Sequence, residues 1–178
     1  MLKNLRFWVP TLIIAGGVIW GGSVFWSVGD NTGYAPVQPI AFNHQLHAGQ
    51  MKIPCMYCHS GAYRSRSAVV PASNVCMNCH SVVATDKPEV QKVRAAYQEG
   101  KPIEWVKVHD LPDFVYFSHK RHISKGVACE ECHGKVETMS RVRQVKSLKM
   151  GWCLECHRGK DAEGKPRNGP TDCSGCHN

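Results

Sequence analysis

Five copies of one short motif, C-x-x-C-H, contain every cysteine in this chain of 178 residues. The five motifs are Cys55/Cys58/His59, Cys76/Cys79/His80, Cys129/Cys132/His133, Cys153/Cys156/His157 and Cys173/Cys176/His177. This spacing is the attachment signature of c-type haem. Two thiols on one turn add to the two vinyl groups of a porphyrin, and the adjacent histidine reaches the iron. The motifs therefore predict five haem c groups, with ten attachment cysteines and five proximal histidine ligands.

Two other uses of cysteine fit the pattern less well. A lone C-x-x-C is typical of a zinc site or a redox pair, but neither requires a histidine after every second cysteine. A disulfide framework also uses an even number of cysteines, but not five identical short spacings. We therefore interpret the chain as a pentahaem cytochrome.

The N-terminal segment predicts a membrane anchor. Residues 7–29 carry no charge, and as a helix they span roughly 35 Å, enough for a hydrocarbon core of about 30 Å. Lys3 and Arg6 precede this segment, so the positive-inside rule places residues 1–6 in the cytoplasm and the rest outside the bacterial inner membrane. Pro10 is expected in the first helical turn, where its missing N–H costs little. Trp8 and Trp26 are expected at the two membrane interfaces.

A cleaved signal peptide is the alternative for this segment, but its apolar region would be shorter and no clean A-x-A site follows here. Gly17 and Gly21 form G-x-x-x-G, and small residues let another helix approach closely in lipid. A retained single-pass anchor that packs against a partner helix is therefore expected.

The net charge of +8 invites a nucleic-acid interpretation. Each ferric haem adds two propionates against one net positive charge, so five haems remove about five positive charges. The loaded protein is then only mildly basic, and no nucleic-acid binding is expected.

Two segments of the chain resemble each other. Residues 42–59 and 117–133 both contain F-x-H-x-x-H, then a short loop, then C-x-x-C-H, and a second C-x-x-C-H follows each. The sequence therefore predicts a duplicated dihaem module with a fifth haem appended. The expected divisions are a cytoplasmic N-terminus (1–6), an anchor (7–29), a linker (30–41), module 1 (42–80), an inter-module segment (81–116), module 2 (117–157) and a fifth-haem segment (158–178).

The inter-module segment predicts one helix, with Asp86 and Glu89 at capping-box spacing and Gly100 as its end. Val90, Val93 and Tyr97 form its apolar stripe. Elsewhere short helices are expected at each motif, with long irregular loops and little or no sheet. The predicted fold class is mainly α, with a single N-terminal transmembrane helix and a multihaem cytochrome c domain.

The distal iron ligands follow from counting. Ten histidines are present, and the five outside the motifs are His44, His47, His109, His119 and His122. Each F-x-H-x-x-H supplies two, which serves four haems, and His109 remains for the fifth. The alternative for one haem is a methionine, Met139 or Met150, because thioether sulfur is a known sixth ligand.

The F-x-H-x-x-H and C-x-x-C-H combination resembles the class III multihaem cytochromes. The wider strings WVKVHDLPDFVYFSHKRH, CEECHG and MGWCLECHR are similar to the pentahaem cytochrome c subunit of bacterial alternative complex III, over about residues 40–177. That resemblance implies a subunit of a menaquinol:acceptor oxidoreductase. The implied partners are integral membrane subunits with the quinol site, an iron–sulfur subunit, and a monohaem cytochrome or a terminal oxidase as acceptor.

Two other classes are weighed. A small membrane-anchored quinol dehydrogenase feeding a periplasmic reductase has a similar length, but it usually has four haems and C-x-x-C-H-x-M at the first. A substrate-reducing multihaem enzyme needs an iron with an open position, and five distal histidines leave none. We therefore expect an electron relay within a larger complex, with no substrate chemistry on this chain alone.

Overall fold

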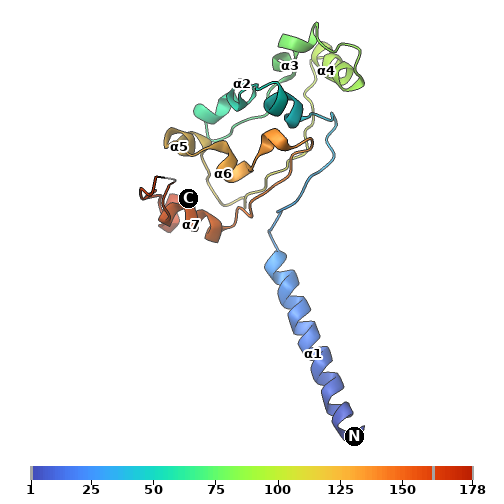
Figure 1. Cartoon of the computed structure of the whole chain (residues 1–178), viewed down its shortest axis with the longest axis vertical. Helices are drawn as coiled ribbons and strands as arrows, with labels where there is room; N and C mark the ends of the chain where they lie inside the picture. Colours follow the sequence, from blue (N-terminus) through green and yellow to red (C-terminus); the bar gives the residue numbers. More distant parts are fainter. Residues whose placement is uncertain (1, 162, 178) are drawn as a thin grey trace. The chain divides into compact units, whose positions relative to one another are not determined.

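The computed structural model describes residues 2–161 and 163–177, and for residues 2–7 and 26 it describes the backbone alone. The chain divides into two compact units, residues 1–30 and residues 31–178 (Figure 1). Each unit is described by itself below.

The first unit is a single helix, α1 (Leu2–Ser27). Its segment Trp8–Phe25 is the one helix in the described part of the chain that is long and apolar enough to cross a membrane. The sequence predicts a span of 7–29, whereas the helix ends at Ser27 and a turn follows, with Gly29 at φ +71°.

The helix also begins earlier than the apolar segment does, at Leu2. Pro10 consequently lies inside the helix, and the prediction that it falls in the first turn is wrong. The expectations for the side chains of Lys3, Arg6 and Trp26 concern side chains outside the described residues.

The second unit consists of short helical segments joined by long loops. In chain order they are η1 (Gln45–Gln50), α2 (Cys55–Cys58), η2 (Ser60–Tyr63), α3 (Ser73–His80), α4 (Pro88–Gln98), α5 (His119–Ser124), α6 (Cys129–His133), η3 (Val136–Thr138), α7 (Met150–Arg158) and η4 (Cys173–Gly175). Within the described residues there is no strand, only an isolated bridge between Lys160 and Pro166. The predicted mainly helical class, with short helices at the motifs and little sheet, is confirmed.

The inter-module helix α4 ends as expected but begins differently. Gly100 has φ +65°, and the N–H groups of Gly100 and Lys101 bond to carbonyls of the last helical turn. At the start, Lys87 is the N-cap without a side-chain cap bond and Pro88 is the first helical residue, so the capping box predicted with Asp86 is wrong. Pro88 needs no N–H partner there, which removes the need for such a cap.

The Glu89 carboxylate makes other contacts. It accepts a 2.7 Å hydrogen bond from the Ala41 backbone N–H and a 2.7 Å bond from Lys92. Helix α4 packs against α3, and of its predicted apolar stripe Val93 is buried whereas Tyr97 is 48% exposed.

The two F-x-H-x-x-H segments pack in a reciprocal way. Helix α5 of the later segment packs on η2, which follows the first C-x-x-C-H, and η1 of the earlier segment packs on η3, which follows the third. Backbone hydrogen bonds match: Lys120 N–H donates to the Ser65 carbonyl (3.2 Å) and Gln45 N–H donates to the Met139 carbonyl (3.0 Å). The F-x-H-x-x-H segment of each half therefore packs against the other half.

The protein core of this unit is small. In the described part of the chain, the buried apolar side chains are Ile40, Ala62, Val93 and Met139, and the one buried polar side chain is Gln144. A domain of about 150 residues ordinarily buries roughly two thirds of the surface of its unfolded chain. The interior of this unit therefore depends on more than its own aliphatic side chains.

Candidate haem-binding site

Each C-x-x-C-H motif begins on its own short helix, and we number them motif 1 to motif 5 in chain order. Motifs 2, 3 and 4 lie on α3, α6 and α7. In motif 1 the two cysteines lie on α2 and His59 follows it, and in motif 5 Cys173 lies on η4 whereas Cys176 and His177 follow it. Positions i and i+3 share one face of a helical turn, so the two thiols of each motif point to one side. All ten cysteines are free thiols in this structure. The local geometry therefore suits addition of both thiols of a motif to one planar group.

The ten motif cysteines differ in how far the polypeptide covers them. Four are exposed, namely Cys55, Cys79, Cys129 and Cys173, and the other six are half-buried. In motif 2 the two thiols are unequal, because Cys76 is half-buried whereas Cys79, near the end of α3, is exposed. The Cys79 carbonyl accepts a 2.8 Å hydrogen bond from the Val83 N–H, which fixes the backbone of Cys79 but does not enclose its side chain.

Four of the five motifs therefore have one exposed thiol each. The physical reason is that each motif helix is a single short turn or two, and one such helix cannot cover both of its own thiols. Haem attachment at Cys79, as at the other nine cysteines, stays a prediction.

The two F-x-H-x-x-H segments have the same ring geometry. Phe42 meets His44 edge-on at 4.7 Å between ring centres and stacks on His47 at 4.4 Å. Phe117 meets His119 edge-on at 4.8 Å and stacks on His122 at 4.4 Å. In both segments one phenylalanine ring thus contacts both imidazoles.

The second histidine of each segment faces the motif histidine at the end of its own half. The ring centres of His47 and His80 are 6.1 Å apart, and those of His122 and His157 are 6.0 Å apart. A metal–imidazole nitrogen bond is about 2 Å long and the ring centre lies roughly 1 Å beyond that nitrogen, so two imidazoles on opposite sides of one metal have centres about 6 Å apart. Both pairs have this separation.

The first histidine of each segment faces the nearer motif. His119 lies parallel to His133, with an interplanar angle of 8° and ring centres 6.3 Å apart. His44 lies close to His59: burial, followed by the neighbouring His59 and then His47, lowers the pKa of His44 to about 4. The structure thus brings four of the five predicted distal histidines to four motif histidines, one to each.

Motif 1 lies between motif 2 and motif 3. Burial raises the pKa of the Cys58 thiol, and the thiols around it, that of Cys76 first, raise it further. Partial desolvation, followed by the neighbouring Cys55 thiol, raises the pKa of Cys129. Motif 3 is therefore beside motif 1, although 74 residues separate them in the chain.

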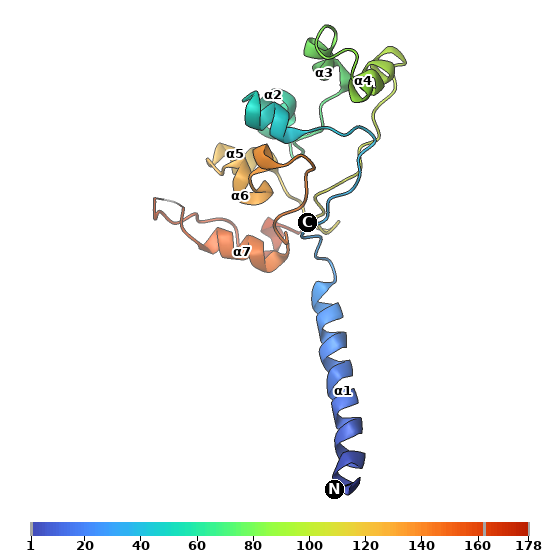
Figure 2. The ribbon, with the colours of Figure 1, turned by 45° about the vertical axis from the view of Figure 1, so that its right-hand side comes forward.

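Motifs 3, 4 and 5 follow one another. Burial raises the pKa of Cys132 to about 11, with the Cys156 thiol as the next cause, and burial followed by the Cys176 thiol raises that of Cys153. The spatial order is thus 2–1–3–4–5. Figures 1 and 2 show α3, α2, α6 and α7 in this order, with the C-terminal segment beside α7.

The donor set fits haem c and not an isolated metal ion. No group of three or more metal-binding side chains gathers in the part of the chain that the structure describes, whereas paired imidazoles with pairs of thiols nearby recur. The Nδ1 atom of His44 is buried and has no hydrogen-bond partner among the described residues. Together with the small apolar core, these features fit large planar groups held between histidines.

The predicted ligands of the fifth haem are placed differently. The ring of His109 lies against His133, with centres 4.4 Å apart, and its pKa is lowered by burial and by His119. His177 of motif 5 has its Nδ1 atom 3.0 Å from the Phe114 carbonyl. The assignment of His109 to the fifth haem stays a prediction.

The two methionine candidates differ in their surroundings. The Met139 side chain is buried, only 6% exposed, and its carbonyl accepts the bond from η1 described above. Met150 begins α7 and is 67% exposed. Their role as alternative ligands likewise stays a prediction.

Two polar side-chain interactions support the motifs and could not be predicted from the sequence pattern. We call them the Gln144 bracket and the Arg167–Glu131 bracket. The Gln144 side chain, 1% exposed, accepts from the Asp110 N–H and donates to the Lys146 carbonyl, both at 2.9 Å. Arg167 pairs with Glu131 of α6 at 2.6 Å.

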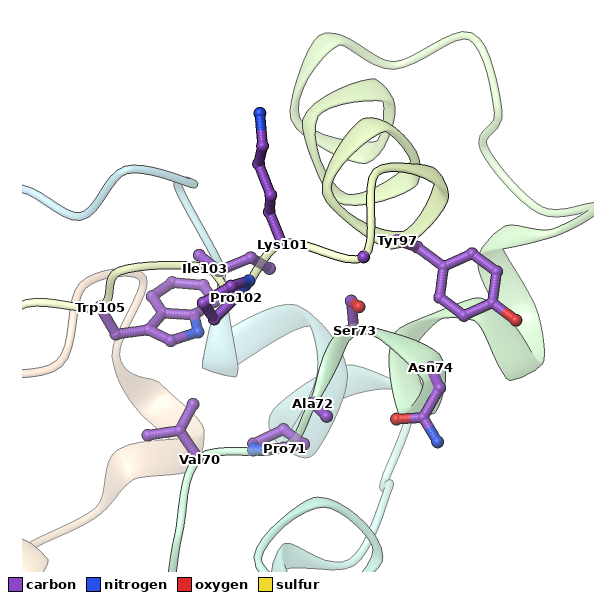
Figure 3. A pocket seen from close by; sticks show the side chains of 11 residues that line it. Val70, Pro71, Ala72, Ser73, Asn74, Tyr97, Lys101, Pro102, Ile103 and Trp105 are labelled. Carbon is purple, nitrogen blue, oxygen red and sulfur yellow. The ribbon is translucent and has the colours of Figure 1, made fainter.

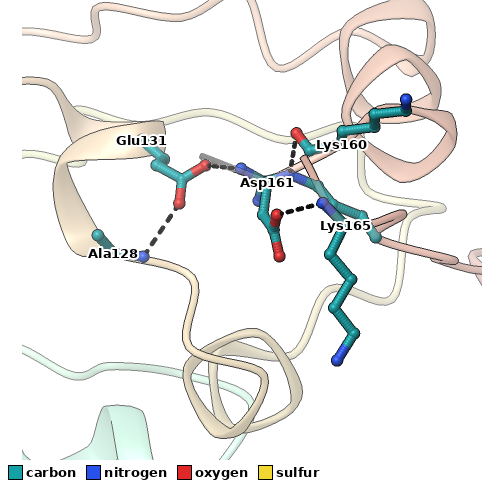
Figure 4. Close-up of polar contacts among 6 residues, drawn as sticks. Ala128, Glu131, Lys160, Asp161 and Lys165 are labelled. Carbon is teal, nitrogen blue, oxygen red and sulfur yellow. Dashed lines mark hydrogen bonds and ion pairs between the residues drawn. The ribbon is translucent and has the colours of Figure 1, made fainter. Parts of the chain in front are cut away.

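The second bracket ties the loop after α7 to motif 3. Glu131 accepts from the Ala128 N–H at 3.3 Å on one side and meets the 160–167 loop on the other (Figure 4). Within that loop, Asp161 accepts from the Lys165 N–H at 2.8 Å. Only the capping-box spacing of Glu131 with the start of α6 could have suggested a role for it.

One hollow of about 610 Å³ lies beside the start of α3. Trp105 and Pro102 line one side and Tyr97 the other (Figure 3). None of its lining residues is a motif cysteine or a histidine. It is therefore separate from the paired imidazoles.

Comparison with known families agrees with this geometry. The family described as cytochrome c7 and related cytochrome c matches residues 115–178. This stretch contains one F-x-H-x-x-H segment and motifs 3, 4 and 5.

Two characterised proteins are similar to the chain. The menaquinone reductase multiheme cytochrome c subunit of Nitratidesulfovibrio vulgaris is 29% identical over 161 residues, covering 79% of this chain and 76% of that protein. Cytochrome c3 of Desulfuromonas acetoxidans is 36% identical over 63 residues, covering 35% of this chain and 79% of that protein.

Proposed function

Because this chain belongs to the multihaem c-type cytochromes related to cytochrome c7, we propose that it is an electron-relay subunit of a membrane complex that exchanges electrons with quinones. The observation that carries this proposal is the recurrence of facing imidazoles 6.0 to 6.3 Å apart beside C-x-x-C-H motifs. The two histidines of such a pair would hold an iron between them and leave it no open position. A saturated iron suits electron transfer and not substrate binding.

The proposed site has five haem c groups, one on each motif, with the motif histidine as proximal ligand. The proposed distal ligands are His47 for motif 2, His44 for motif 1, His119 for motif 3 and His122 for motif 4. When bound, haem c would supply reversible one-electron chemistry at its iron, and the motifs that would hold the groups follow the order 2–1–3–4–5. The chain's own residues hold the imidazoles in place, and motifs 2 and 5 are the two ends of the relay.

The proposed modules follow the divisions predicted from the sequence, with residues 42–80 and 117–157 as two dihaem modules and 158–178 as the fifth-haem segment. The reciprocal packing of η1 on η3 and of α5 on η2 supports a duplication. So does the match between the two sets of phenylalanine–histidine distances.

The proposed complex resembles alternative complex III. One transmembrane helix cannot form a quinol site, so integral membrane subunits carry it, an iron–sulfur subunit accompanies them, and a monohaem cytochrome or an oxidase lies at the far end. The similarity to a menaquinone reductase subunit supports a quinone-linked complex. In such a relay the direction of electron flow would depend on the potentials of the partners at its two ends.

The proposed location is the bacterial inner membrane, with α1 as the anchor, the N-terminus in the cytoplasm and the haem unit outside. Gly17 and Gly21 have open space around them, so a partner helix can approach the α1 backbone there. Replacing both glycines with leucine is expected to release the cytochrome from its membrane partners with its haems intact. Co-purification unchanged by the double substitution would show that this patch faces lipid.

The ligand pairing is tested by His122→Ala in the full-length chain, with Lys120→Ala on the same helix as the matched control. Lys120 is exposed, so its loss leaves the imidazoles in place. His122→Ala is expected to convert one haem from low to high spin, seen by electron paramagnetic resonance, while intact mass shows every haem still attached. An unchanged low-spin count would remove His122 from the ligand set.

A further inference from the structure

Nearly every haem-ligand histidine proposed above uses its Nδ1 atom in the same way. Seven of these Nδ1 atoms lie 2.7 to 3.0 Å from a backbone carbonyl oxygen: those of His47, His59, His80, His119, His122, His157 and His177. Binding iron through Nε2 leaves the proton on Nδ1, and the carbonyl accepts it. This second bond fixes the tautomer and the ring orientation of a ligating imidazole.

His133 is the exception that has a side-chain partner. Its Nδ1 atom lies 3.1 Å from Nε2 of His109, and the two rings meet edge-on at 82°. The opposite side of His133 faces His119. His133 is therefore flanked by two imidazoles, one parallel across the proposed iron position and one at its outer nitrogen.

The chemistry assigns the two nitrogens of this contact. If His133 binds iron through Nε2, its Nδ1 carries the proton and must donate. The Nε2 atom of His109 must then accept, with the proton of His109 on its own Nδ1. A nitrogen that accepts this bond has its lone pair engaged and cannot bind a second iron at the same time.

We propose that His109 is a positioning residue for the haem of motif 3, which accepts a hydrogen bond from the proximal ligand His133, and is not the sixth ligand of the motif 5 haem. The inference rests on the haem attachment proposed above. It differs from the assignment of one distal histidine to every haem. At motif 3 the His109 ring accepts the Nδ1–H bond that a backbone carbonyl accepts at the other motifs.

Hydrogen bonds of Gln144 fix the backbone next to His109. The N–H of the next residue, Asp110, donates to the buried Gln144 side chain at 2.9 Å. The Gln144 backbone is itself tied to the 33–34 segment, because its carbonyl accepts from the Gly33 N–H at 2.8 Å and its N–H donates to the Tyr34 carbonyl at 3.0 Å. This bracket keeps the His109 ring beside His133.

The acceptor at Nδ1 also affects the redox equilibrium. A hydrogen bond donated from Nδ1 increases the basicity of a ligating imidazole, which favours the ferric form. Its loss is therefore expected to shift the ferric–ferrous equilibrium of one haem toward the ferrous form by about tenfold, which is about 59 mV for a one-electron couple.

The test uses the full-length, haem-loaded chain with two substitutions, His109→Gln and His109→Phe. Glutamine keeps a side-chain acceptor but cannot replace an imidazole on iron, whereas phenylalanine keeps the ring and removes the acceptor. Redox titration and electron paramagnetic resonance are the readouts, and intact mass gives the haem count.

Both variants are expected to keep the wild-type number of low-spin haems. His109→Phe shifts the potential of one haem upward and changes one low-spin signal, and His109→Gln restores both toward wild type. One additional high-spin haem in His109→Gln would overturn the inference and assign His109 as an iron ligand, even if His109→Phe fails to mature. Wild-type potentials in both variants would overturn it too. Failure of the proposed function has a different signature, because the wild-type chain itself would then lack haem on motif 3.

Discussion

The Gln144 bracket is expected to be among the largest single side-chain contributions to the stability of the haem unit. Gln144→Ala removes two hydrogen bonds of 2.9 Å, which join the Asp110 N–H and the Lys146 carbonyl across a buried position. A buried polar group left without its partner costs about 1–3 kcal/mol. Because Asp110 is exposed and Lys146 half-buried, water recovers part of that cost.

The expected loss is therefore about 2–4 kcal/mol, including roughly 0.8 kcal/mol for each buried methylene that alanine lacks. Gln38 offers a matched control, because its side chain also brackets a backbone, with two 2.9 Å bonds to Val106. Gln38 is only half-buried and Val106 is 40% exposed, so water can replace those bonds. Gln38→Ala is expected to cost about 1 kcal/mol or less.

The assay is guanidinium unfolding of the full-length, haem-loaded chain in detergent, followed by the Soret band and by circular dichroism. The midpoint for Gln144→Ala is expected to fall clearly below that for Gln38→Ala. Equal midpoints for the two variants would refute the argument that burial of the bracket determines its contribution.

Two further predictions concern the loop after α7. Arg167→Met removes the 2.6 Å ion pair with Glu131; the Arg167 side chain is 21% exposed and that of Glu131 36%. In the same assay the free energy of unfolding is expected to fall by about 0.5–1 kcal/mol, and by less at high salt. A change that does not depend on salt would contradict an ionic origin. Gly169→Ala adds a Cβ atom into the ring of His157, and is expected to destabilise by about 1–3 kcal/mol and to alter one low-spin haem signal. Gly151→Ala, which meets open space on α7, is its control and is expected to be neutral or slightly stabilising; similar effects of both would refute the steric reason.

The sequence predicted those parts of the site that short-range spacing determines. A C-x-x-C-H motif needs one helical turn, and F-x-H-x-x-H places two imidazoles beside one phenyl ring, so both were predictable without tertiary information. The end of α4 just before Gly100 was predictable for the same reason. Its start was not, because Glu89 bonds to Ala41, which is 48 residues away.

The pairing and the order of the motifs could not be predicted. Which histidine faces His80 and which faces His59 depends on how the chain folds between them, and no local pattern encodes that. The reciprocal packing inserts motif 3 beside motif 1, so the spatial order differs from the chain order. The motif also does not predict that Cys79 is more exposed than Cys76, because the spacing of the two cysteines and the histidine is the same in every copy. Gln144 carries no signal in the sequence, since a single buried glutamine looks like any surface residue until its partners are known.

The central claim is that all five C-x-x-C-H motifs hold haem c in one chain. Intact-mass spectrometry of the protein from its own membranes tests this most directly, because thioether bonds survive denaturation. We predict the mass of the polypeptide plus five haem groups, and tandem mass spectra with one haem on each cysteine pair, the exposed Cys79 included. A mature chain with four haems or fewer, or with any motif pair recovered as free thiols, would contradict the account.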